Sequence, residues 1–158
     1  MILRDQIATV WGVGHTIYMP GTAASLLAFS LAMLAISAAG VIGYWLIWVL
    51  TAIILVVGFK ASSAYSLRYA KWDPPECVID EFAAVMLIAC VMPLYLPSWF
   101  TALIVFRTFD IWKPYPITEI EKLMEPGPRI MLDDILAAVP AIASGWLVYF
   151  ISLFFIGI

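Results

Sequence analysis

The sequence predicts an all-α, polytopic integral membrane protein, a helical bundle that contains a helical hairpin and polar loops on one side. The chain has 158 residues, of which 65% are hydrophobic and only 12% charged, whereas soluble domains average about 25% charged residues. Its mean hydropathy is +1.03. The length suits one membrane-embedded domain, residues 1–158.

The distribution of charge predicts which parts of the chain lie in lipid. All charged side chains fall in three segments, residues 4–5, 60–81 and 107–134. An ionised side chain at the centre of a bilayer costs about 2.5–3.5 kcal/mol on insertion scales. The uncharged stretches between these segments are therefore predicted to enter the membrane.

The first half of the chain is predicted to form a short interfacial helix and two spans. Residues 1–12 fit the interfacial helix, and 13–22 fit a loop punctuated by glycine and proline. Apolar runs at 23–39 and 44–59 follow, joined by a turn at Gly40 and Gly43. Each run is near the lower length limit for a spanning helix. Residues 60–72 are then predicted to continue the second helix outside the membrane, where they are exposed to water.

The second half is predicted to hold a hairpin and a last span. Asp73-Pro74-Pro75 breaks the preceding helix, and a new one is expected from near Glu76 to Met92. The stretch 82–106 is long enough for one span, but the prolines at 93–97 favour a hairpin. A polar loop is expected at 114–129.

The last span is expected at 135–156, with a kink at Pro140. In this arrangement all three charged segments lie on one side, and their eight Lys and Arg residues indicate that this side faces the cytoplasm.

The net charge of −3 argues against a nucleic-acid partner. Four tryptophans fit either interface anchors or buried packing residues: Trp45, Trp48, Trp99 and Trp146.

Three polar motifs stand where a charged segment meets an apolar one. They are DPPECVIDE at 73–81, FRTFDIWKP at 106–114 and GPRIMLDDILAA at 127–138. Each has a purely structural interpretation when taken alone: solvation of a helix end, an Arg107–Asp110 ion pair on one helix face, and acidic residues at a helix N-terminus. Pro114 is expected to turn Lys113 out of its helix.

Together the motifs bring carboxylates from three segments to one depth in the membrane. These carboxylates would repel one another unless a cation were bound between them. Mg²⁺ prefers oxygen ligands, usually one or two carboxylates with phosphate and water. Arg107 and Lys113 are then candidate phosphate partners. The loop with His15, Thr22 and Ser25 around Pro20-Gly21 could bind an anion at a helix N-terminus, although a lone histidine is more often structural.

With HTIYMPGTAAS at 15–25 and FRTFDIWKPYPI at 106–117, these motifs resemble the phosphatidylglycerophosphatase A family over residues 13–138. The resemblance implies Mg²⁺-dependent conversion of phosphatidylglycerophosphate to phosphatidylglycerol at the bacterial inner membrane. It implies site residues Asp80, Glu81, Asp110, Asp133, Asp134, Arg107 and Lys113. The chain departs from the family pattern at four small or apolar positions, Met19, Ala24, Ala84 and Ala138, which concern packing more than chemistry.

The leading hypothesis is a Mg²⁺-dependent lipid phosphatase whose partners are its phospholipid substrate and the membrane. Asp80, Asp110 and Asp134 are the first candidates for metal ligands, with Glu81 a further one. Glu81 or Asp133 could be the general base, and a covalent aspartyl-phosphate stays open. The oligomeric state stays open as well.

Two other classes of protein fit parts of the same pattern. A divalent-cation transporter or metal-binding membrane protein would be expected to place a carboxylate inside an apolar stretch, and none is there. A CDP-alcohol phosphotransferase would carry D-x₂-D-G-x₂-A-R, which is absent from the sequence.

Overall fold

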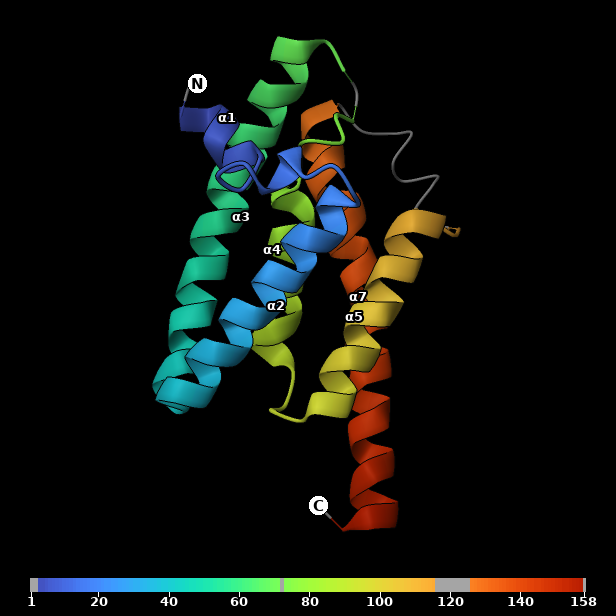
Figure 1. Cartoon of the computed structure of the whole chain (residues 1–158). Helices are drawn as coiled ribbons and strands as arrows, with labels where there is room; N and C mark the ends of the chain where they lie inside the picture. Colours follow the sequence, from blue (N-terminus) through green and yellow to red (C-terminus); the bar gives the residue numbers. More distant parts are fainter. Residues whose placement is uncertain (1–2, 72, 116–125, 158) are drawn as a thin grey trace.

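The computed structural model describes residues 3–71, 73–115 and 126–157, and all regular structure in these residues is helical (Figure 1). The elements are α1 (Leu3–Ala8), a 3₁₀ turn (Val13–His15), α2 (Pro20–Ala39), α3 (Val41–Tyr69), α4 (Ile79–Val91), α5 (Leu96–Trp112) and α7 (Pro126–Ile156). Three helices, α2, α3 and α7, are long and apolar enough to cross a membrane. The prediction of an all-α membrane bundle is confirmed.

The short helix α4 is the centre of the bundle. It packs against α2, α3 and α7, while α5 lies mainly against α7 (Figure 1). Ten of its 13 residues are buried. Alanines such as Ala24, Ala28, Ala83 and Ala84 are fully buried, and small side chains of this kind let membrane helices approach closely. The bundle therefore screens α4 from lipid and holds its polar first turn near the axis.

The predicted hairpin is confirmed, since α4 and α5 are joined by a turn at residues 92–95. Three aromatic donors from three other elements satisfy carbonyl groups at this turn. Trp99 Nε1 donates to the Pro93 carbonyl at 2.7 Å, Tyr44 Oη to that of Met92 at 2.9 Å, and Trp146 Nε1 to that of Val91 at 3.1 Å. Such bonds matter because non-helical backbone at membrane depth is tolerated only where protein satisfies it.

The four tryptophans thus divide between the two roles left open by the sequence. Trp99 is buried and Trp146 is half-buried, and both bond the hairpin turn. Trp45 and Trp48 are exposed on α3, at 68% and 46%. The first pair has the packing role, and the second pair remains available as interface anchors.

Replacing Trp99 with phenylalanine is expected to lower the free energy of unfolding by about 0.5–1.5 kcal/mol, because it removes one of the two hydrogen bonds to the Pro93 carbonyl, which keeps only the Tyr95 N–H. Thermal or denaturant unfolding in detergent would measure the loss. Trp45→Phe is the matched control, and its effect should stay within about 0.5 kcal/mol because the side chain is exposed. Equal effects of the two variants would contradict the role given to Trp99.

Two predicted boundaries are wrong. The central helix begins at Ile79, not near Glu76, because the Val78 N–H donates to the Ala8 carbonyl at 2.9 Å and holds the preceding loop against α1. The last helix begins at Pro126, so residues 126–129 are helical and not loop as expected. Proline is accepted in a first helical turn, where its missing N–H has no partner to lose.

Other predictions are confirmed in part. The short helix expected within residues 1–12 is present as α1, while its place at the membrane interface stays a prediction, and α3 continues through the charged segment to Tyr69. One face of that continuation is buried, including Ser62 and Tyr65, because α1 packs on α3. The rest of the expected loop, with Glu119, Glu121, Lys122 and Glu125, lies outside the described residues. The helix α7 runs unbroken through Pro140, and a kink there stays a prediction.

Candidate active site

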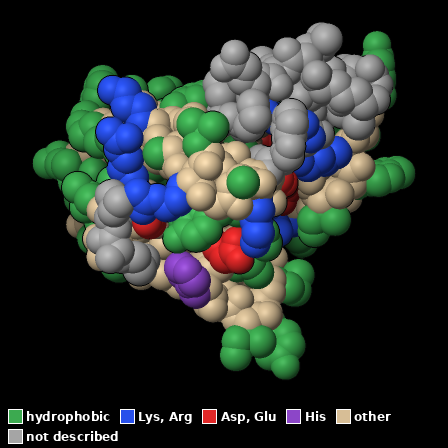
Figure 2. Space-filling model, turned by 90° about the horizontal axis from the view of Figure 1, so that it is seen from above, with side chains coloured by type: hydrophobic (Ala, Val, Ile, Leu, Met, Phe, Trp, Pro, Cys, Tyr) green, Lys and Arg blue, Asp and Glu red, His purple; other side chains and the backbone are tan. Residues whose placement is uncertain are grey.

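A polar cavity of about 250 Å³ lies where one end each of α2, α4, α5 and α7 meets the loop before α4. It is lined by Pro20, Gly21, Asp73, Pro74, Pro75, Cys77, Asp80, Glu81, Asp110, Lys113, Asp133 and Asp134. All three polar motifs therefore reach one site. Seen from above, acidic and basic side chains gather on this end of the molecule, and green hydrophobic side chains surround them (Figure 2).

The local sequence explains how the end of α5 positions the cationic side chain of Lys113. The helix ends at Lys113, whose φ of 44° and ψ of 61° are left-handed. A proline disfavours helical backbone in the residue before it, and Pro114 follows directly. Lys113 leaves the helix as expected, and its Nζ lies 2.5 Å from Asp133 Oδ2 on α7.

Three carboxylates form a compact cluster at the base of the cavity. Oxygen atoms of Asp80, Glu81 and Asp134 all lie within 4.8 Å of one another. Asp80 is 7% exposed and Asp134 is 3% exposed. Burial, followed by the charge of Glu81, raises the pKa of Asp80, which stands in the first turn of α4.

Each member of this cluster also has a buried oxygen that no described group satisfies, namely Asp80 Oδ1, Glu81 Oε2 and Asp134 Oδ2. A buried polar atom without a partner costs about 1–3 kcal/mol, and more when the group is charged. A hard divalent cation would satisfy all three oxygens and cancel their repulsion. The donor set, the spacing and the unsatisfied atoms thus fit Mg²⁺.

Arg107 holds two of the predicted acidic residues in place. Its Nη1 lies 2.5 Å from Asp110 Oδ2 and 3.8 Å from Glu81 Oε1. The ion pair expected within α5 is therefore present. Of the expected metal ligands, Asp80, Glu81 and Asp134 lie together, and a ligand role for Asp110 stays a prediction.

Gly21 brings the start of α2 into contact with the same groups. A Cβ atom built at this position would overlap Glu81 Oε1 and lie 3.2 Å from Arg107 Nη1. The preceding Met19 has a left-handed φ of 48°, and Pro20 opens the helix. The backbone at the start of α2 thus lies so close to the cluster that a larger residue at this position would require Glu81 to move.

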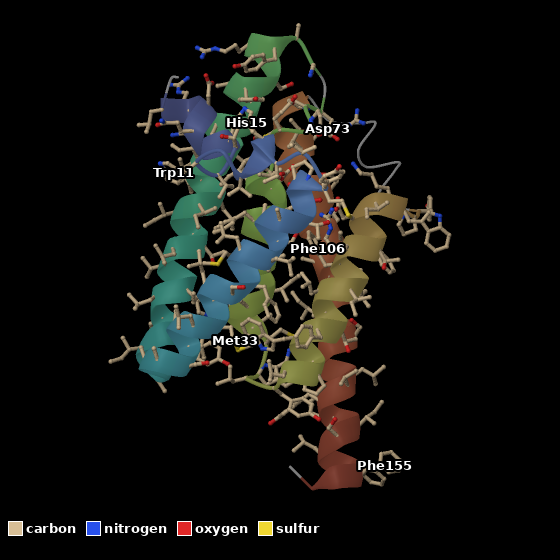
Figure 3. The ribbon with its side chains drawn as sticks, in the orientation of Figure 1. Trp11, His15, Met33, Asp73, Phe106 and Phe155 are labelled. Atoms are coloured by element: carbon tan, nitrogen blue, oxygen red, sulfur yellow. The ribbon has the colours of Figure 1, made fainter. Side chains whose placement is uncertain are left out.

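The predicted substrate-binding residues of the first loop stand apart from this cavity. His15 is exposed (Figure 3), and the Ser25 hydroxyl donates to the Gly21 carbonyl at 2.9 Å within α2. The buried Thr22 Oγ1 has no partner among the described groups. None of the three lines the cavity, and their contact with substrate stays a prediction.

Sequence reasoning missed two cavity residues that carry chemistry, Asp73 and Cys77. Both belong to the DPPEC stretch, and their place beside Asp80 and Glu81 in one motif was the available signal. Burial, followed by the charges of Glu81 and Asp73, raises the pKa of the Cys77 thiol well above its usual range. The thiol is therefore neutral at physiological pH.

The fold and the cavity define a helical membrane protein with a buried carboxylate cluster and two cationic side chains at the polar end of its bundle. The family model for Phosphatidylglycerophosphatase A matches residues 6–149, and the chain belongs to this family. It is therefore an enzyme, a phosphatase, and the resemblance seen in its motifs is confirmed.

Three curated relatives are similar in sequence to this chain over most of their length. Phosphatidylglycerophosphatase A of Haemophilus influenzae is 31% identical over 137 residues, which cover 86% of this chain and 82% of the relative. The Escherichia coli protein of that name is 30% identical over 156 residues, covering 92% and 81%. A putative phosphatidylinositol-3-phosphatase of Bacteroides thetaiotaomicron is 30% identical over 145 residues, covering 84% and 85%. No solved structure gives a significant match.

Proposed function

We propose that this enzyme hydrolyses phosphatidylglycerophosphate to phosphatidylglycerol and phosphate, with Mg²⁺ bound by Asp80, Glu81 and Asp134. The observation that carries the proposal is a cluster of three carboxylates with oxygens within 4.8 Å of one another, each of which also has a buried oxygen without a partner. Membership of the family supports the substrate. When bound, Mg²⁺ would polarise a phosphoryl oxygen and lower the pKa of an attacking water.

The residues around the cluster then have distinct tasks. Lys113 Nζ, held at the cavity wall by Asp133, is placed to attract a phosphate oxygen as a point charge. The first N–H groups of α2 lack partners within their helix, and Gly21 exposes that end of α2 to the cavity, where a phosphate would be favoured. Asp133 lines the cavity outside the carboxylate cluster and is our candidate general base.

The site lies at one end of a bundle with three apolar helices long enough to span a bilayer. A lipid could therefore keep its acyl chains in the membrane while only its headgroup enters the cavity. The concentration of Lys and Arg in the charged segments supports a cytoplasmic position for this end. The bacterial relatives support the bacterial inner membrane as its location.

Chelation of divalent cations is expected to lower phosphate release from phosphatidylglycerophosphate by at least about 100-fold, because a bound metal contributes several kcal/mol to such reactions. The assay would use purified protein in mixed micelles with EDTA, followed by Mg²⁺ addition to restore the rate. Phosphatidylinositol 3-phosphate and phosphatidic acid would test headgroup selectivity, given the Bacteroides relative. A rate that EDTA leaves unchanged would contradict the metal assignment.

A further inference from the structure

Two separate hollows are lined by residues of both α2 and α5: the polar cavity at one end and an apolar pocket toward the other. The two helices run in opposite directions, and α2 packs mainly on α4 while α5 packs mainly on α7 (Figure 1). A row of α2 residues spaced in multiples of four lies on one face of that helix and covers the distance between the two hollows. Its members are Gly21, Phe29, Met33 and Ser37.

Residues of the two helices meet at two levels between these hollows. At the polar end, Gly21 lies against Arg107. In the middle, the ring of Phe29 lies 5.4 Å from the rings of both Trp99 and Phe100, measured between centroids. Toward the far end Met33 comes next on α2, well below Phe106 in Figure 3.

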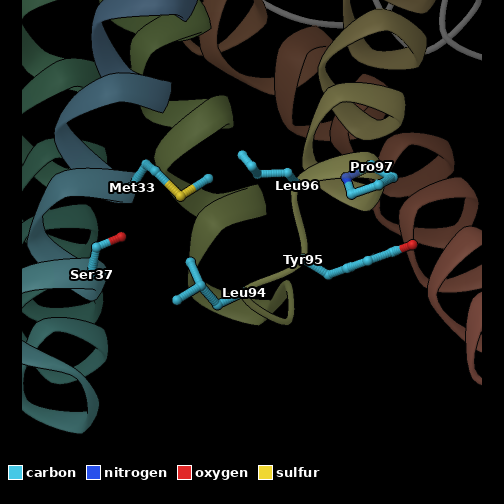
Figure 4. Close-up of a pocket in the computed structure, with 6 residues that line it drawn as sticks. All are labelled: Met33, Ser37, Leu94, Tyr95, Leu96 and Pro97. Atoms are coloured by element: carbon cyan, nitrogen blue, oxygen red, sulfur yellow. The ribbon is translucent and has the colours of Figure 1, made fainter. Parts of the chain in front are cut away.

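The second hollow is a largely apolar pocket of about 570 Å³ beside the hairpin turn (Figure 4). The pocket is lined by Met33, Ser37, Leu94, Tyr95, Leu96 and Pro97. In Figure 4 the side chains of Met33 and Leu96 approach each other from α2 and α5 across the space above Leu94. The pocket thus joins the same two helices that meet at the catalytic end.

The depth of this pocket matches the length of a lipid chain. At a rise of 1.5 Å per residue, Phe29 lies about 12 Å and Met33 about 18 Å along α2 from Gly21. One leaflet is half of a hydrocarbon core about 30 Å thick, or about 15 Å. A lipid with its phosphate beside Gly21 would therefore end its chains near Met33.

We propose that one acyl chain of the lipid substrate runs over the exposed side of Phe100 and places its end in the pocket beside Met33. This inference rests on the proposed function, because it needs the phosphate in the polar cavity. A second apolar groove, about 530 Å³ and including Leu27, Leu31 and Phe82, lies between α2 and α3. It shares no lining residue with the polar cavity and lies on the other side of α2 from Met33, so it serves as the comparison.

The test is the dependence of kcat/KM on acyl-chain length. Met33→Trp should fill the pocket and lower kcat/KM about 10-fold for a dipalmitoyl substrate, since single methylene groups in apolar pockets change selectivity 10-fold or more. The dioctanoyl substrate, which is too short to reach Met33, should react at the wild-type rate. Ser37→Phe, at an exposed position of the pocket wall, should give the same pattern with little risk to folding.

Leu31→Trp is the matched control, because it adds the same side chain to the groove on the other side of α2. It should leave the ratio of dipalmitoyl to dioctanoyl kcat/KM unchanged. An unchanged ratio in both Met33→Trp and Ser37→Phe would overturn the proposal, as would a changed ratio in Leu31→Trp alone. Failure of the proposed function would look different, since wild-type protein would then release no phosphate from either substrate.

Discussion

Asp80→Asn and Asp134→Asn are each expected to lower phosphate release by at least about 100-fold while the protein stays folded. Both side chains are buried, and each offers an unsatisfied oxygen to the same small volume. An amide keeps the shape of the carboxylate but loses its charge, and Mg²⁺ binds strongly only where carboxylates supply that charge. A metal contribution of several kcal/mol sets the size of the loss.

The same variants should gain thermal stability when divalent cations are absent. Each removes one of three mutually repelling, buried carboxylates, and like charges at short range disfavour the charged form of a site. Loss of activity with a raised melting temperature in EDTA would therefore identify a functional cluster, whereas a structural role would lower both. Titration with Mn²⁺, followed by its electron paramagnetic resonance signal, would report the weaker metal binding directly.

Glu76→Gln is the matched control for these two variants. It changes an acidic residue of the same motif, which pairs with Lys71 at 3.6 Å outside the carboxylate cluster. Its activity should stay within about twofold of wild type, since surface substitutions away from special features have small effects. Full activity of both Asp80→Asn and Asp134→Asn would show that the site is elsewhere.

Much of this architecture could be predicted from where charge is absent. Charged side chains are so costly in lipid that their segments mark the polar end of the bundle, and the prolines near 93 mark the hairpin turn. The departure of Lys113 from its helix also followed from Pro114 alone. These features depend on local chemistry, which a sequence displays directly.

Other features depend on the packing of distant segments and could not be predicted. A buried helix and a lipid-facing helix are both apolar on all sides, so nothing in the sequence marked α4 as the central one. The grouping of Glu81 with Asp80 and Asp134, and the position of Arg107 Nη1 3.8 Å from Glu81 Oε1, both depend on how different helices pack together. The contact of Gly21 with Glu81 joins residues 60 positions apart.

Gly21→Ala is expected to lower kcat by about 100-fold with a modest effect on stability. The added methyl group would overlap Glu81 Oε1 and press on Arg107, so the carboxylate must move away from its partners in the cluster. Displacement of a catalytic group by about 1 Å can cost 10²-fold in rate. Within a helix, alanine is otherwise favoured over glycine by about 1 kcal/mol, which would offset part of the strain.

Gly58→Ala is the matched control for Gly21→Ala. It measures what an added methyl group costs elsewhere in the bundle, away from Glu81. A Cβ atom at Gly58 would lie 3.2–3.3 Å from side-chain atoms of Met131 and Ile79, and the flexible end of Met131 can shift. Its activity should therefore remain near wild type. If Gly21→Ala kept wild-type kcat and metal affinity, the start of α2 would have room to retreat from Glu81. Its close approach would then be a packing feature, and the anion site proposed at its N-terminus would lose its support.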